Sequence, residues 1–196
     1  MGKKRLEDAI QKIDYPIEVT YRCFELDPTM ERDVNVKMDE ALAKKYGMSI
    51  EQAKENNQRM VQMAKETGLD YNLDTLILTN TFDAHRLTML AKKHGLMIEM
   101  TERILYAYFT ESKHIGDHQT LTELAVEVGL EREEVEKMLA SDEMAEEVRA
   151  DQQQAIQYGI TGVPFFLINK KYALNGAQPT DVFIQALEKV IAEEQS

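Results

Sequence analysis

The sequence has very few of the residues that build covalent or metal-based sites. Among its 196 residues there is one cysteine, Cys23, and there is no tryptophan. A single cysteine excludes an intramolecular disulfide, a Cys-x-x-Cys redox motif and a multi-cysteine metal site within these residues. No segment is rich in proline, glycine or serine, so we expect no flexible linker and no low-complexity tract.

Long apolar runs and an excess of positive charge are also missing. No run of about 18 apolar residues is present, and the charged residues 1–8 lack the apolar stretch of a secretory signal. We therefore expect no membrane span and, by default, a cytoplasmic location. With 35 acidic and 23 basic residues the net charge is −12, which argues against nucleic acid as a partner. Hydrophobic residues make up 43% of the chain, enough for a folded core.

The start of the chain predicts a helix followed by a strand. Apolar residues from Leu6 to Ile13 are spaced as on one face of a helix, which indicates an amphipathic helix over residues 2–13. After a short break, apolar and polar residues alternate. This period of two predicts a strand over residues 17–26, with Cys23 on its apolar face.

Residues 36–158 show a helical pattern throughout. Ser49 with Gln52, and Thr120 with Glu123, have the spacing of capping boxes, and each pair predicts the start of a helix. From these caps, the apolar spacing and the closing glycines, we expect helices over about 38–46, 50–67, 80–94, 101–108, 120–128, 131–140 and 142–158, the last capped by Ser141.

The end of the chain predicts a loop, a hairpin and a helix. Thr161, Gly162, Val163 and Pro164 form a turn between the last of these helices and an apolar run. A proline that opens a buried strand after such a turn suits an X-Pro bond in the cis form. We expect strands over 164–169 and 172–175, and a final helix with Pro179 at its first position.

The order of these elements predicts an α/β (α+β) fold that is mostly helical. A helix and a strand come first, a block of helices follows, and a loop, two strands and a helix close the chain. We expect residues 1–35 and 142–196 to form one α/β domain. Residues 36–141 are then an all-helical insertion in that domain.

Several stretches resemble one known family. They are Gly2-Lys-Lys-Arg-Leu-Glu7, Phe24-Glu-Leu-Asp-Pro28, Asn80-Thr-Phe-Asp-Ala-His-Arg-Leu87, the segment from Gly159 to Phe166, and Asn175-Gly-Ala-Gln178. In order and spacing they are similar to the DsbA family, and within it to FrnE-type proteins. The resemblance implies a thioredoxin-like sheet interrupted by an all-α insertion. It also implies thiol–disulfide oxidoreductase activity on protein or peptide substrates.

The sequence departs from this family at its start. The family's first strand and its Cys-x-x-Cys dithiol precede the segment that resembles residues 2–7, and neither is present here. We therefore expect the chain to be inactive unless it is extended upstream, and we expect Met1 to be an internal methionine of a longer reading frame. In the family's fold the missing strand lies between those expected at 17–26 and 164–169. Residues 17–26 are then expected not to pair normally unless something replaces that strand.

The resemblance also implies a substrate-binding loop. A cis-proline loop formed by Thr161, Gly162, Val163 and Pro164 would present its backbone to a substrate as an added strand. An ordinary strand-opening proline gives the same sequence pattern, and the residues alone leave both interpretations open.

Other candidate residues each have a structural alternative. The resemblance places Asn80 and His85 toward the substrate side, but a helix-capping asparagine and a structural histidine fit the same pattern. Cys23 is expected to be a core residue rather than a reactive thiol. His114 and His118 lie in an expected loop, where histidines are usually solvated, so we expect no metal site and no cofactor.

Three functions stay open from the sequence. The first is a thiol–disulfide oxidoreductase of the DsbA/FrnE type, which in a reducing cytoplasm would reduce or isomerise disulfides. The second is a glutathione-dependent isomerase or transferase branch of the same fold, whose serine near the first helix is equally missing. The third is a non-catalytic peptide-binding module. The expected partners are protein or peptide thiols and disulfides, and a homodimer is left open.

Overall fold

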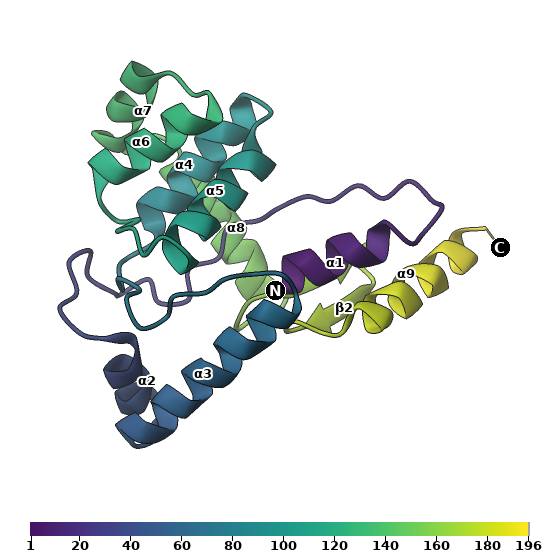
Figure 1. The fold of residues 1–196 in the computed structure, drawn as a ribbon. Coiled ribbons are helices and arrows are strands. Elements are labelled where there is room, and N and C mark those ends of the chain that lie inside the picture. The colour runs from purple at the N-terminus through teal and green to yellow at the C-terminus, as the bar shows by residue number, and fades with distance from the viewer. Residues whose placement is uncertain (196) are drawn as a thin grey trace. The chain divides into compact units, whose positions relative to one another are not determined.

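The computed structural model describes residues 1–195, and in them it contains nine helices and one two-stranded sheet (Figure 1). The elements in order are α1 (Gly2–Ile10), α2 (Met38–Tyr46), α3 (Ile50–Glu66), α4 (Phe82–Lys93), α5 (Met97–Phe109), α6 (His118–Val128), α7 (Arg132–Leu139), α8 (Ala145–Gln157), β1 (Phe165–Ile168), β2 (Tyr172–Asn175) and α9 (Thr180–Glu194). The predicted mostly helical α+β fold is confirmed. No helix in the described part of the chain is long and apolar enough to cross a membrane.

The chain divides into two compact units. Unit 1 is Met1–Thr20 together with the chain from Ala155 onward, and unit 2 is Tyr21–Gln154. The boundary between the two units lies between Gln154 and Ala155, within α8. The domain limits expected from the sequence, at residues 35 and 142, stay a prediction.

Unit 2 is a helical unit whose main core lies among α4 to α7 (Figure 1). Leu87 and Leu90 of α4 are completely buried there, as are Leu121 and Leu124 of α6. Twenty buried residues form this one cluster. Because each of these helices turns one apolar stripe toward the others, the core is closed by unit 2's own side chains.

Helix starts in unit 2 follow the local capping chemistry. The capping box at Ser49 is confirmed, since Gln52 N–H donates to Ser49 Oγ at 3.1 Å and Ser49 N–H donates to Gln52 Oε1 at 2.9 Å. The box expected at Thr120 is wrong. Helix α6 starts two residues earlier, because the Asp117 carboxylate accepts from Thr120 N–H at 2.7 Å and caps the helix. His118 is therefore the first residue of a helix and not a loop residue.

Other element ends also differ from the sequence prediction. Helix α8 begins at Ala145 rather than near residue 142, because Met144 has a left-handed φ of 65° that a right-handed helix does not accommodate. Pro179 is the N-cap of α9 and not its first helical residue. The first helix ends at Ile10, where the next bonds run from i to i−3 and tighten the last turn.

Unit 1 consists of α1, the β1–β2 hairpin and α9, with α1 and α9 side by side (Figure 1). The strands pair antiparallel, with Phe166 opposite Leu174. Its core cluster contains three buried residues, which are Ala9, Phe183 and Leu187. Eight more hydrophobic side chains pack against them but stay partly exposed. Unit 1 thus has an apolar interior that it covers only in part.

The strand expected at residues 17–26 does not form. These residues carry no strand assignment, and the sheet in the described chain contains β1 and β2 only. The exposure of residues 16–20 still alternates as in a strand, with Ile17 and Val19 half-buried and Glu18 and Thr20 exposed. The expectation that this segment lacks normal pairing is therefore confirmed.

Candidate functional site

The loop before β1 has the geometry predicted for it. The Val163–Pro164 peptide bond is cis, as the sequence led us to expect. Thr161 is exposed and Val163 is 47% exposed. Within residues 1–195 no hydrogen bond is made to the backbone of residues 161–163, whereas Gly176 N–H donates to Pro164 O at 2.8 Å. The loop thus offers free backbone groups, and the hairpin holds its proline end.

The first turn of α1 packs directly against this loop. A β-carbon added at Gly2 would lie 2.7 Å from Pro164 Cγ and 3.1 Å from Phe166 Cζ. Such distances leave no room for a side chain, so a glycine is required where the helix meets the proline. Arg5 Nη1 donates to Ala177 O at 2.5 Å and ties α1 to the end of the hairpin. Unit 1 therefore places a helix N-terminus beside the cis-proline.

This arrangement suits thiolate chemistry but holds no thiol. The N-terminus of a helix carries a partial positive charge, which stabilises an anion and lowers the pKa of a cysteine placed there. No residue of unit 1 is a cysteine. The loop has unpaired backbone groups, but within these residues the site has no thiol nucleophile to exchange disulfides.

Cys23 belongs to unit 2 and is unsuited to reaction. It is 2% exposed, and its Sγ lies 3.8 Å from the His85 carbonyl oxygen. Burial raises the pKa of the Cys23 thiol to about 12, and the nearby Asp151 carboxylate adds to this effect. At neutral pH the side chain is a protonated, buried thiol, as expected for a core residue.

Asp151 holds the extended segment that contains Cys23. The Asp151 carboxylate accepts from Cys23 N–H at 2.8 Å and from Arg22 Nη1 at 2.9 Å. Next to it, Gln152 Oε1 accepts from Glu25 N–H at 3.0 Å. Side chains of α8 thus accept from two backbone donors of this segment, which has no strand partner among the described residues.

Asn80 and His85 lie in unit 2, and each has a structural contact. Asn80 Oδ1 accepts from Phe82 N–H at 2.8 Å, and Asn80 Nδ2 donates to Met30 O at 2.9 Å. His85 is half-buried, and burial lowers its pKa to about 4, so it is neutral at pH 7. That the two residues bind a substrate stays a prediction.

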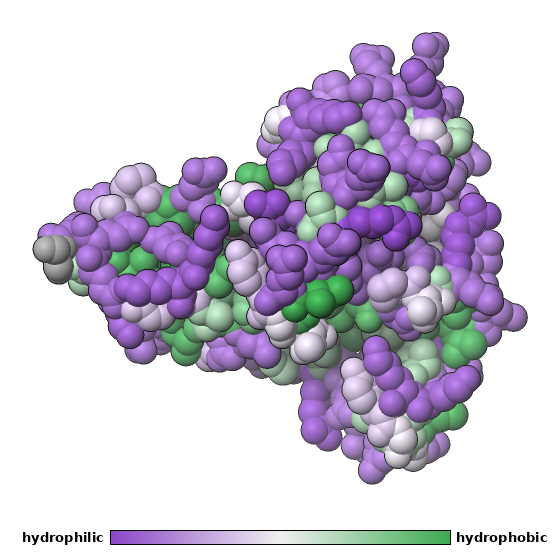
Figure 2. All heavy atoms as spheres, turned by 180° about the vertical axis from the view of Figure 1, so that it is seen from behind, coloured by the Kyte–Doolittle hydropathy of each residue, from purple (hydrophilic) through white to green (hydrophobic). Residues whose placement is uncertain are grey.

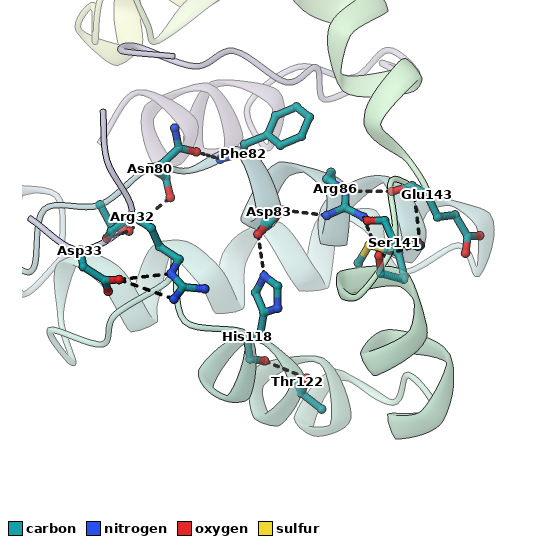
Figure 3. A network of polar contacts seen from close by, with 12 residues as sticks. Arg32, Asp33, Asn80, Phe82, Asp83, Arg86, His118, Thr122, Ser141 and Glu143 are labelled. Atoms are coloured by element: carbon teal, nitrogen blue, oxygen red, sulfur yellow. Dashed lines mark hydrogen bonds and ion pairs between the residues drawn. The ribbon is translucent and has the colours of Figure 1, made fainter. Parts of the chain in front are cut away.

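A polar network in unit 2 was not predicted from the sequence (Figure 3). Arg86 is 4% exposed and donates to Asp83 Oδ1 at 2.7 Å, to Glu143 O at 2.9 Å, and to the carbonyl oxygens of Met138 and Ser141. The other Asp83 oxygen lies 2.7 Å from His118 Nε2. Arg86 therefore binds one backbone carbonyl in the last turn of α7 and two that follow it, which fastens the end of that helix to α4.

The two histidines considered as metal ligands have other contacts in and near this network. His118 pairs with Asp83, and His114 Nε2 lies 3.0 Å from the carbonyl oxygen of Arg32. Among the described residues no group of three or more potential ligands gathers in the way that a metal ion requires.

Comparison with known proteins matches nearly the whole chain. A family model described as a DSBA-like thioredoxin domain matches residues 1–188. A curated Bacillus subtilis protein, the uncharacterized protein YwbO, is 31% identical over 204 residues, which cover all of this chain and 90% of that protein.

Solved structures show the same similarity. The crystal structure of a probable DsbA oxidoreductase from Streptomyces coelicolor has a TM-score of 0.94 and 39% identity, over 98% of this chain and 84% of that one. A cytosolic disulfide reductase, DsbM of Pseudomonas aeruginosa, solved with GSH, has a TM-score of 0.61 over 97% of this chain and 92% of that one. Its 16% identity supports a shared fold alone.

Proposed function

The chain belongs to the DSBA-like thioredoxin domain family of thiol–disulfide oxidoreductases, and on this basis we propose that residues 161–164 hold an extended protein or peptide substrate. The observation that carries the proposal is the unpaired backbone of residues 161–163, directly before the Pro164 that lies against the N-terminus of α1. A peptide that adds to such an edge gains main-chain hydrogen bonds whatever its sequence. The loop is therefore suited to substrates that share a thiol or disulfide and little else.

Residues 1–196 lack the dithiol that this chemistry requires. The one cysteine is buried in unit 2 with a raised pKa. We propose that a dithiol placed directly before Gly2 would complete the site, because it would lie at the N-terminus of α1 and beside Pro164. A cytoplasmic location and reduction or isomerisation of disulfides are part of this proposal.

An insulin-reduction assay tests the proposal in two steps. The 196-residue chain should show no thiol-dependent turnover above buffer. A variant that carries an apolar strand and a Cys-x-x-Cys sequence fused directly before Gly2 should reduce insulin, and a matched Ser-x-x-Ser fusion should not. Turnover by the unextended chain, or equal rates for the two fusions, would contradict the assignment.

A role for the loop has its own control within the active fusion. Val163→Pro removes a backbone N–H donor from the exposed loop, and it should raise the KM for a peptide disulfide more than it lowers kcat. Tyr158→Ala changes another exposed residue before the loop and should leave both constants nearly unchanged. Equal effects of the two substitutions would mean that the loop backbone does not bind substrate.

A further inference from the structure

Unit 2 contains a polar cavity between α3 and residues 70–75, which follow that helix (Figure 1). Its volume is about 400 Å³, within the range of small-molecule sites of roughly 300–1,000 Å³. Hydrophilic side chains cover most of the face shown in Figure 2, and the hydrophobic ones visible there lie in several separate groups. A polar cavity is therefore a more distinctive binding feature of this chain than an apolar face.

The two walls of the cavity are held by different parts of unit 2. Asn72 N–H donates to Phe109 O at 2.7 Å, and Thr110 Oγ1 donates to Asp70 O at 2.6 Å. The ring of Tyr71 stacks on Phe109 with the ring centroids 4.8 Å apart. The loop is thus fastened to the end of α5, whereas α3 packs along α2. The cavity is preformed, as ligand sites usually are.

A buried amide without a partner faces this cavity. Asn57 lines it and is 6% exposed, and its side chain has no hydrogen bond to any other residue from 1 to 195. Other buried polar side chains of unit 2, such as Thr79, Arg86 and Thr88, each have at least one. An unpaired buried amide destabilises a fold, so native proteins rarely keep one. The partner of Asn57 therefore lies in the cavity, as a ligand or as water.

Further free polar groups surround Asn57 and favour a ligand. Five exposed residues of the lining have side chains with no hydrogen bond or ion pair in the described chain, and they form a rim. They are Gln58, Gln62, Lys65, Asp70 and Asp74. The half-buried Val61 and the buried Leu73 add apolar surface to the lining. Polar groups that converge on a concave surface are typical of a binding site.

The mixture of groups defines the chemistry of the ligand. Amides donate and accept hydrogen bonds, carboxylates accept them and an ammonium group donates them. Two carboxylates against one ammonium group disfavour a simple anion. A metal ion does not fit, because no group of three His, Cys, Asp or Glu residues gathers in the described chain. A hydroxyl group donates and accepts at once, so a molecule with several hydroxyls can satisfy the amide and the carboxylates together.

We propose that this cavity binds a small neutral polyhydroxy compound, of the sugar or polyol class, with Asn57 as its buried hydrogen-bonding group. The Asn57 amide accepts from one ligand hydroxyl and donates to a neighbouring one. Asp70 and Asp74 accept from hydroxyls at the rim, and the C–H faces of the ligand cover Val61 and Leu73. The site lies wholly in unit 2, so it is separate from residues 161–164 and its occupation needs no dithiol.

A titration followed by NMR tests this on the 196-residue chain. The probes are glucose, galactose, mannose, ribose and myo-inositol, each added up to about 50 mM. At least one should shift the Asn57 side-chain amide and the backbone amides of residues 57–65 and 70–75 along a saturable curve, with unit 1 unchanged. No saturable shift with any of the five would overturn the proposal. Equal or larger shifts of the same amides with glycine, inorganic phosphate or Ca²⁺ would overturn the assignment to polyols.

A substitution at Asn57 separates a ligand contact from a structural one. Asn57→Leu keeps the size of the side chain and removes the amide, so it should weaken binding at least tenfold. It should leave Tm unchanged or raise it, because no internal hydrogen bond is lost. Asn56→Leu makes the same change at an exposed neighbour outside the lining and should not affect binding. A Tm lowered by several degrees in Asn57→Leu would show a structural amide and overturn the proposal.

A rim variant gives a check that leaves the interior intact. Asp74→Asn changes an exposed residue and should weaken binding about threefold, since one acceptor is replaced by a weaker one. If Asp74→Asn and Asn57→Leu both bind the probe as tightly as the unchanged chain does, the probe is held elsewhere and the proposal is wrong.

Discussion

The two units of this chain differ in how completely they cover their apolar side chains. In unit 2, twenty buried residues form one cluster among helices that close over it. In unit 1, which is less than half as long, the core cluster has three buried residues, and the eight hydrophobic side chains packed against them stay partly exposed. Small units always bury a smaller share of their surface. Size alone does not explain why the backbone of residues 15–20 has no hydrogen-bond partner among residues 1–195.

The polar groups of the two units differ in the same way. In unit 2 the backbone donors of Cys23 and Glu25 bond to side chains of α8, and Arg86 bonds to carbonyl groups in the last turn of α7 and after it. In unit 1 the backbones of residues 15–20 and 161–163 have no such partners among residues 1–195. Unpaired backbone is stable only where water or a ligand reaches it. The open backbone of residues 161–163 thus lies where substrate binding is proposed.

The largest effect is expected at Arg86 in unit 2. Arg86→Leu removes four hydrogen bonds, which run to Asp83 and to the carbonyl oxygens of Met138, Ser141 and Glu143, and it leaves the buried end of Asp83 without its cation. The loss should be about 3–5 kcal/mol in the free energy of unfolding, as for other broken buried ion pairs. Urea unfolding followed by circular dichroism measures it. Arg132→Leu breaks an exposed pair with Glu136 and is the control, expected to cost less than about 1 kcal/mol.

Matched leucine truncations test the difference in core closure. Leu124→Ala empties a site that is 0% exposed in unit 2 and should cost about 3 kcal/mol. Leu174→Ala in β2 removes a side chain that is only partly buried and should cost about 1 kcal/mol. Denaturation followed by NMR signals from each unit gives both values. A larger loss at Leu174 than at Leu124 would reverse the comparison.

Acid should weaken unit 2 through His85. The pKa of His85 is lowered from 6.5 to about 4 by burial, so the unfolded chain binds a proton there more readily than the folded chain. The stability that depends on neutral His85 is complete above pH 6.5 and is lost as the pH falls toward 4. The loss should reach about 2 kcal/mol near the bottom of this window.

Thermal unfolding between pH 7 and pH 4 measures this dependence. In the variant His85→Gln the fall in stability across the window should be smaller than in the unchanged chain. His94→Gln changes an exposed histidine that pairs with Glu134. It should leave the dependence of stability on pH nearly unchanged. If His85→Gln is as pH-sensitive as the parent, another group causes the loss.

The smallest effect on stability, and the clearest on reactivity, concerns Cys23. Its thiol is 2% exposed with a pKa of about 12, so alkylation by iodoacetamide at pH 8 should be at least tenfold slower than in urea. Because the folded pKa lies above the unfolded value of 9.0, Cys23 stabilises the fold below pH 9 and this contribution is lost as the pH rises toward 12. Equal alkylation rates with and without urea would show an open thiol.

The sequence predicted features that depend on neighbours in the chain. The capping box at Ser49, the strand at residues 172–175 and the cis bond at Pro164 all follow from nearby residues, and all are confirmed. The start of α6 was misplaced, because the Thr120 pattern gives no sign that Asp117 accepts the Thr120 N–H. Asp117 and Thr120 are both common capping residues, and only the structure shows which of them caps the helix.

Features that depend on distant residues were beyond sequence reasoning. The alternation at residues 17–26 is a real feature of the extended segment, but a strand also requires a paired neighbour, and none is present among the described residues. Arg86 resembled any surface arginine of a helix, since its carbonyl partners lie more than 50 residues away in the chain. For the candidate site, the loop at residues 161–164 with its cis bond was predicted from local sequence, whereas the unpaired segment at residues 17–26 was expected only from the family resemblance.

Amide hydrogen exchange on the 196-residue chain at low concentration tests the central claim most directly. We predict that residues 17–20, with Phe165 and Leu167, exchange within seconds to minutes, while amides of α4 and α6 stay protected for hours. Strong protection of residues 17–20 in the monomer would show that unit 1 closes its own sheet, and would contradict the account.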